Sequence, residues 1–244
     1  MVRMSFGARP LVAALAGAFL LASAGEAAAQ AVPATTPAPR DANWIKRHEK
    51  LLEDSRKARE EGGATVVFLG DSITHGWGKT PTWEKYYAPR KALNLGIGGD
   101  KTQHVLWRIK NGEVEGLKPR ALVLMIGTNN SAQDPADAIA AGVEAIVADL
   151  RTRLPETKIL LLGVFPRSAK PEDPIRGKLK EVNARISKLN DGDKIHYLDI
   201  GETFLEKDGT ISKEIMPDYL HLTPQGYERW AEAIEPTLKK LLGE

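Results

Sequence analysis

The sequence contains no cysteine among its 244 residues. That absence excludes disulfide bonds, a thiol nucleophile and zinc bound through cysteine. A strong net charge is also absent, because 34 lysines and arginines nearly balance 32 acidic residues and the basic residues form no cluster. A basic groove for nucleic acid is therefore not expected.

Long hydrophobic runs are scarce as well. The apolar stretch over residues 11–25 falls short of the roughly 20 residues that span a bilayer. Two arginines precede it and small residues follow, so residues 1–31 are interpreted as a secretory signal peptide, cleaved after Ala29 or Ala31. We therefore expect a secreted or periplasmic protein without stable membrane anchoring.

The remaining chain divides by composition into a short segment and a long one. Residues 32–42 are rich in proline and threonine, with hardly any large apolar side chain, which is typical of a flexible linker. Residues 43–244 have the length and composition of one ordinary globular domain. We interpret them as a single folded domain.

Five short apolar runs within that domain are predicted as β-strands, with helical patterns between them. The runs cover residues 64–70, 91–97, 121–127, 158–164 and 195–200. Because they are continuously apolar, both faces of the sheet are expected to be covered by helices. The pattern predicts an α/β fold, a three-layer α/β/α sandwich around a five-stranded parallel sheet.

Polar residues follow four of the predicted strands, where a parallel sheet places its ligand site. They include Asp71 with Ser72, the turn Gly98-Gly99-Asp100, Asn129, and Asp218 with His221. A serine hydroxyl needs an adjacent base, histidine suits that role, and a carboxylate holds the histidine tautomer. Glycine N–H groups and an asparagine amide can stabilise the oxyanion of an acyl-transfer intermediate. Together these residues predict nucleophilic catalysis at Ser72.

Each of these residues also has a purely structural explanation. Ser72 is a possible helix N-cap, the two glycines a turn and Asn129 a cap. His75 is the rival base because it lies three residues after Ser72, and Asp71 is the rival acid. It is the coincidence of all the candidates at one sheet edge that favours catalysis.

Four residues near the mouth of this site are assigned to substrate binding. They are Asp71, His75, Trp77 and Tyr219. The two aromatic rings would offer a platform on which a sugar face can stack. Arg108, on a predicted amphipathic helix, is expected to be solvated.

Four short blocks carry a resemblance to a known family. GDSI (70–73), LNLGIGGD (93–100), GTNN (127–130) and DYLH (218–221) resemble the four blocks of the SGNH/GDSL hydrolases. Within that family, residues 93–130 look closest to the catalytic subunits of the intracellular platelet-activating factor acetylhydrolases. The resemblance implies a flavodoxin-like sheet.

The resemblance also implies a reaction. Ser72 matches the nucleophile, Asp218 the acid and His221 the base, while Gly99, Asn129 and the Ser72 N–H match the oxyanion hole. Ester hydrolysis would then proceed through an acyl-serine intermediate, with no cofactor and no metal.

The substrate is less defined than the chemistry. The ITHGW segment (73–77) looks more like bacterial acetylesterases acting on sugars, so a secreted esterase for short acyl groups on carbohydrates or related small esters is expected. The alternatives are a phospholipid acetylhydrolase, an O-acyltransferase and a thioesterase. A non-catalytic carbohydrate-binding module would be indicated by a missing Ser, Asn or His, and none is missing. A homodimer is left open as a partner.

Overall fold

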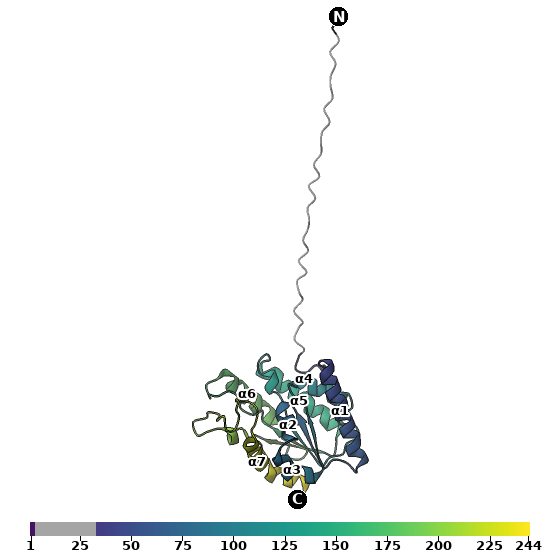
Figure 1. Cartoon of the computed structure of the whole chain (residues 1–244), viewed down its shortest axis with the longest axis vertical. Coiled ribbons are helices and arrows are strands. Elements are labelled where there is room, and N and C mark those ends of the chain that lie inside the picture. The colour runs from purple at the N-terminus through teal and green to yellow at the C-terminus, as the bar shows by residue number, and fades with distance from the viewer. Residues whose placement is uncertain (3–32) are drawn as a thin grey trace. The chain divides into compact units, whose positions relative to one another are not determined.

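The computed structural model describes residues 1–2 and 33–244, and one compact unit runs from Val32 to Glu244. Strands and helices alternate along this unit (Figure 1). The predicted signal peptide, residues 1–31, falls on the part of the chain outside the described residues, apart from the first two, and stays a prediction.

The unit is built around one parallel sheet of five strands. The strands are β1 (Val66–Gly70), β2 (Ala92–Gly96), β3 (Ala121–Met125), β4 (Lys158–Leu162) and β5 (Ile195–Leu198). All four pairings are parallel and the order is β2-β1-β3-β4-β5, which confirms the predicted flavodoxin-like sheet. The chain passes from β1 to β2 on one side and to β3 on the other. A ligand crevice is therefore expected at the carboxyl end of β1.

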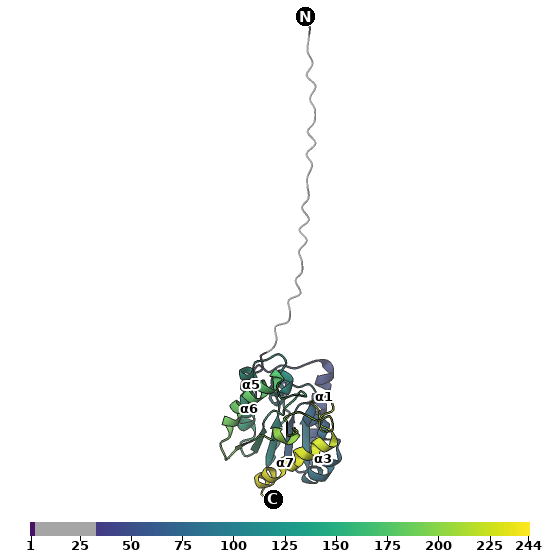
Figure 2. The same ribbon diagram turned by 90° about the vertical axis from the view of Figure 1, so that its left-hand side faces the viewer.

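Helices cover both faces of the sheet, as the apolar strands predict (Figures 1 and 2). One face packs against α1 (Ala42–Glu60), α4 (Thr102–Lys110), α5 (Ala136–Arg153) and α6 (Pro174–Ile186). The other packs against α2 (Ser72–Trp77), α3 (Pro81–Tyr86) and α7 (Pro224–Leu242). The predicted three-layer α/β/α sandwich is confirmed.

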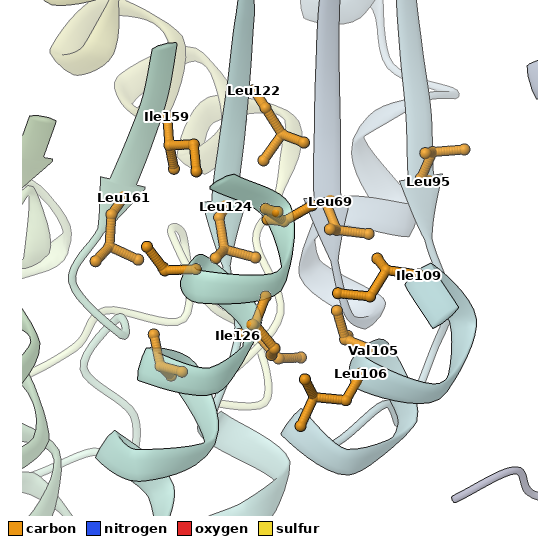
Figure 3. Close-up of a cluster of buried hydrophobic side chains, with 14 of the residues drawn as sticks. Leu69, Leu95, Val105, Leu106, Ile109, Leu122, Leu124, Ile126, Ile159 and Leu161 are labelled. Atoms are coloured by element: carbon orange, nitrogen blue, oxygen red, sulfur yellow. The ribbon is translucent and has the colours of Figure 1, made fainter. Parts of the chain in front are cut away.

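Successive side chains of a strand point to opposite faces of the sheet, so each strand contributes to the hydrophobic core on both faces. In β1, Val67 and Leu69 join the core under α4 and α5, whereas Val66 and Phe68 join the core under α2 and α7. Figure 3 shows strand leucines of the first core beside Val105, Leu106 and Ile109 of α4, where they form a continuous apolar layer.

The segment predicted as a flexible linker, residues 32–42, is instead held against the domain over its described part. The Ala34 side chain is buried, and its carbonyl accepts a hydrogen bond of 2.9 Å from the Thr102 hydroxyl. Further along, the Ala38 N–H donates to the Gln103 carbonyl. This expectation was wrong because composition does not reveal a segment that docks through a small buried side chain and its own backbone groups.

Candidate active site

Ser72 stands at the junction of the central strand β1 and helix α2. Gly70 ends the strand, and Asp71 caps the helix by accepting a hydrogen bond of 3.0 Å from the Ile73 N–H. Ser72 is therefore the first residue of α2 and only partly buried. Its hydroxyl lies at the carboxyl edge of the sheet, beside the crevice that the strand order predicts.

Asp218 and His221 reach Ser72 from the loop before α7. The His221 Nε2 atom lies 2.8 Å from Ser72 Oγ, and the His221 Nδ1 atom lies 2.6 Å from Asp218 Oδ2. An ionised Asp218 holds the proton on Nδ1, so Nε2 accepts a hydrogen bond from the serine hydroxyl. The three side chains form one continuous chain of hydrogen bonds, as the sequence predicts.

The turn between Asp218 and His221 is itself fixed by the acid. Asp218 Oδ1 accepts hydrogen bonds from the N–H groups of Leu220 (3.1 Å) and His221 (2.8 Å). Partial burial opposes ionisation of Asp218, but the hydrogen bonds from the His221 ring and backbone outweigh it and lower the pKa of this carboxyl. The carboxylate is therefore charged across the neutral pH range and positions the imidazole.

The loop after β2 passes alongside the serine. A Cβ atom placed on Gly98 would lie 3.8 Å from Ser72 Cβ, and Gly99 adopts a φ of +78°, which favours glycine. The Asn129 amide nitrogen donates a hydrogen bond of 2.9 Å to the Asp100 carbonyl. The structure thus joins the loop that contains Gly99 to Asn129 and lays it next to Ser72, while the role of both residues as oxyanion donors stays a prediction.

Comparison with known proteins decides the family. A family model described as GDSL-like Lipase/Acylhydrolase matches residues 68–229, the stretch that contains every predicted catalytic and oxyanion residue. The chain belongs to this family. Human platelet-activating factor acetylhydrolase IB subunit alpha1 is 38% identical over 218 residues, covering 87% of this chain and 92% of that protein.

Other relatives and solved structures agree on family and fold. The rat alpha2 subunit is 39% identical over 205 residues, 84% of this chain and 87% of its own. A GDSL-like lipase from Bacteroides thetaiotaomicron matches with a TM-score of 0.66 at 21% identity, covering 79% of this chain and 97% of that one. An acetylxylan esterase from Geobacillus stearothermophilus matches with a TM-score of 0.58 at 19% identity, covering 75% and 95%. These two structures support the fold.

Two of the residues assigned to substrate binding are buried away from any substrate. Trp77 is fully buried against Phe68 and Trp230, with 4.0 Å between the centroids of its ring and that of Trp230. Helical periodicity explains the error, since Trp77 lies four residues after the buried Ile73 and shares its inward face. Trp77 is a core residue of this member of the GDSL-like family.

Asp71 is the second such residue. It has no solvent exposure, and its Oδ1 atom is occupied as the cap of α2. Among the described residues its Oδ2 atom has no hydrogen-bond partner, and burial raises the pKa of this carboxyl to about 7. Because its side chain is fully buried, Asp71 positions the backbone at the start of α2 and does not contact a substrate.

His75 and Tyr219 remain open to a substrate role. His75 is partly buried, and burial together with the charges of Arg47 and Lys79 lowers its pKa. Tyr219 lies between the acid and the base with a φ of +60°, and its ring is partly exposed, 5.7 Å from the Lys213 ammonium. Their contact with substrate stays a prediction.

A buried cluster of charged residues, Arg108 with Asp100 and Glu113, was not predicted from the sequence. Arg108, expected in solvent, is fully buried, 2.8 Å from Asp100 and paired with Glu113. It also donates to the carbonyls of Leu95 (2.8 Å) and Gly70 (3.1 Å), near the ends of β2 and β1. It ties together β2, which the Gly99 loop follows, and β1, which is followed by Asp71 and by Ser72 at the start of α2. A sign was present in the sequence, because Arg108 shares the helix face of the apolar residues Val105 and Ile109.

Residues 33–244 also bear on the expectations about membrane anchoring and metal binding. None of the helices in this range combines the length and apolar character needed to cross a membrane. In the same range no three His, Asp or Glu side chains are grouped so that they could hold a metal ion. The expectation of a metal-free and cofactor-free reaction remains a prediction.

Proposed function

We propose that this protein is a serine esterase that acts through an acyl-serine intermediate. The observation that carries the proposal is the chain of hydrogen bonds from Asp218 through His221 to the Ser72 hydroxyl, at the edge of the sheet where ligands bind. An oriented histidine next to a serine is the arrangement that makes a hydroxyl nucleophilic at neutral pH.

The proposed reaction follows from this geometry. His221 Nε2 takes the hydroxyl proton as Ser72 Oγ forms a bond to the ester carbonyl carbon. The carbonyl oxygen becomes an oxyanion, which the N–H groups of Ser72 and Gly99 and the Asn129 amide stabilise. The bond to the alcohol then breaks and His221 returns its proton to that alcohol. Water then gives a proton to His221 as it attacks the acyl carbon, the bond between that carbon and Ser72 Oγ breaks, and His221 returns the proton to Oγ as the carboxylic acid leaves.

The exposure of the catalytic side chains supports a short acyl group. The His221 side chain is 45% exposed to solvent and the Asp218 side chain is 53% exposed. A long acyl chain bound at such an open site would remain largely in water and gain little from burial. An acetyl ester is therefore the substrate we propose to test first.

Two kinds of acetyl ester, which differ in the alcohol that carries the acetyl group, should be compared in that test. Acetylated carbohydrate is supported by the partly exposed ring of Tyr219, since aromatic rings stack on sugar faces. An acetylated phospholipid is supported by the relatives of 38–39% identity that are named platelet-activating factor acetylhydrolase subunits. Acetate release from acetylated xylooligosaccharide and from platelet-activating factor, measured side by side, separates the two.

The experiment on the reaction itself compares wild type, Ser72→Ala and a control, Ser187→Ala, whose hydroxyl bonds to the Ala184 carbonyl on the surface. Wild type and the control should release acetate at equal rates, and Ser72→Ala should fall to the background. Equal rates from all three would refute catalysis through an acyl group on Ser72. Acetyl transfer to an added sugar, or faster cleavage of an acetyl thioester, would instead identify a transferase or a thioesterase.

We also propose that the protein is exported, on the strength of the charged and apolar pattern of residues 1–31. Expression of the whole chain in a bacterium should yield a shortened protein outside the cytoplasm that begins at Gln30 or Val32. A full-length chain retained in the cytoplasm would contradict export without affecting the proposed chemistry.

A further inference from the structure

Arg40 belongs to the docked N-terminal segment, far in sequence from the catalytic blocks. Its Nη1 atom donates a hydrogen bond of 2.8 Å to the Gly98 carbonyl. The guanidinium also lies beside Gly99, because a Cβ atom placed there would meet Arg40 Nη1 at 3.0 Å. Arg40 therefore contacts the loop that lies next to Ser72.

The hydrogen bond from Arg40 acts on one particular peptide unit. The Gly98 carbonyl and the Gly99 N–H belong to the same planar peptide, so fixing the direction of the oxygen fixes the direction of the N–H. That N–H is the one that the proposed reaction directs at the oxyanion. A cationic donor on the carbonyl also polarises the peptide and strengthens the N–H as a donor.

A peptide between two glycines needs such a restraint. Neither residue has a Cβ atom to limit rotation, and Gly99 already occupies a φ of +78°. If the Gly98–Gly99 peptide turned over, the N–H would leave the site and a carbonyl oxygen would face the developing negative charge. We infer that Arg40 is a positioning residue that holds the Gly98–Gly99 peptide in the orientation required for oxyanion stabilisation, an inference that rests on the proposed esterase function.

The contacts of Arg40 indicate that the domain does not depend on this residue to fold. Its side chain is 31% exposed and lies 3.5 Å from Asp100. Asp100 has other partners, since Trp44 Nε1 lies 2.6 Å away and the buried Arg108 lies 2.8 Å away. Loss of Arg40 therefore leaves the Asp100 carboxylate bonded and should leave the domain folded.

The test measures Arg40→Ala, Arg40→Lys and a control, Arg56→Ala, whose side chain pairs with Glu60 on the exposed face of the neighbouring helix α1. With p-nitrophenyl acetate we expect Arg40→Ala to lower kcat about 10- to 100-fold, less than the loss of a whole oxyanion donor, with KM and Tm close to those of the control. Arg40→Lys should recover part of kcat, because it keeps a charged donor.

Two additional measurements distinguish positioning from a general structural effect. Millimolar guanidinium should restore part of kcat to Arg40→Ala and leave the control unchanged. A fluorophosphonate, whose phosphoryl oxygen occupies the oxyanion hole, should label Ser72 more slowly in Arg40→Ala by a similar factor. An unchanged kcat and labelling rate, or a change in KM alone, would overturn the inference while leaving the esterase intact. Wild type that neither hydrolyses esters nor is labelled at Ser72 would overturn both.

Discussion

The Nε2 atom of His221 lies 2.8 Å from Ser72 Oγ, although 149 positions separate the two residues. The sheet order explains the contact, because β1 lies at the centre of the sheet and α7, which follows His221, packs against the face that α2 also covers. Tyr227 of α7 fixes this approach by donating a hydrogen bond of 2.8 Å to the Ile73 carbonyl, one residue beyond the nucleophile. Packing of the last helix thus sets the distance between nucleophile and base.

Replacement of Asp218 by asparagine should lower kcat by about 10²- to 10⁴-fold with little change in stability. The amide cannot hold the proton on His221 Nδ1, so the ring loses the tautomer that accepts from Ser72. Steady-state kinetics on an acetyl ester check this. The matched control is Asp208→Asn, since Asp208 accepts a similar backbone hydrogen bond in a distant turn, from Thr210. Equal losses in both variants would contradict the assignment.

Asp71→Asn should flatten the pH dependence of stability between about pH 4 and pH 7. Burial raises the pKa of Asp71 to about 7 in the folded state, against about 3.9 when unfolded. The stability that protonated Asp71 contributes to the folded protein is fully present below pH 4. It is lost as pH rises through 7, because the carboxyl of the unfolded chain releases its proton at a lower pH than that of the folded chain.

The measurement for Asp71 is urea unfolding of wild type and Asp71→Asn from pH 4 to pH 8. The difference between the two proteins isolates Asp71 from Glu113, whose pKa burial also raises to about 7, with the nearby Arg108 opposing the rise. Between pH 4 and pH 8 the free energy of unfolding of the wild type should fall by up to about 4 kcal/mol more than that of Asp71→Asn. Parallel curves would show that Asp71 is ionised in the folded protein throughout.

Trp77→Ala should lower the free energy of unfolding by about 3–5 kcal/mol, because it opens a cavity beneath α2 between Phe68 and Trp230. Trp77→Phe should lose less, since the smaller ring still fills part of the space. Denaturant unfolding measures the loss, and KM of the folded variants should stay near the wild-type value. A raised KM with unchanged stability would return Trp77 to the substrate site.

Arg108→Met should lower the free energy of unfolding by about 3–5 kcal/mol, because it removes the cation that pairs with the buried carboxylates of Glu113 and Asp100. The double variant Arg108→Met with Glu113→Gln should be more stable than Arg108→Met, since one of the two carboxylates that lost the cation is then neutral. Thermal and urea unfolding of the three proteins test this. A single variant as stable as wild type would show that the pair contributes nothing.

Much of the fold and of the central site could be predicted from the sequence. Continuous apolar strands such as β3 specify a covered parallel sheet, and that topology gathers polar residues at one edge whatever their separation. Ser72, Asp218 and His221 can be predicted in this way because each follows a clear break in the apolar pattern.

The rest could not be predicted because burial and docking depend on tertiary neighbours. Trp77 looks like a surface aromatic after a catalytic block until α7 is seen to cover it. Arg108 looks solvated until two acidic partners are placed beside it. Arg40 sits in a proline-rich stretch whose composition resembles a linker, and only its contact with the Gly98 carbonyl indicates a role.

The most direct test of the account is to find the acyl group on the protein during turnover. Wild type quenched rapidly after mixing with p-nitrophenyl acetate should contain one acetyl group, and peptide mass spectrometry should place it on Ser72. Ser72→Ala should contain none and should not turn over. Hydrolysis by Ser72→Ala at the wild-type rate, or an acetyl group that maps to another residue on the pathway, would contradict the account.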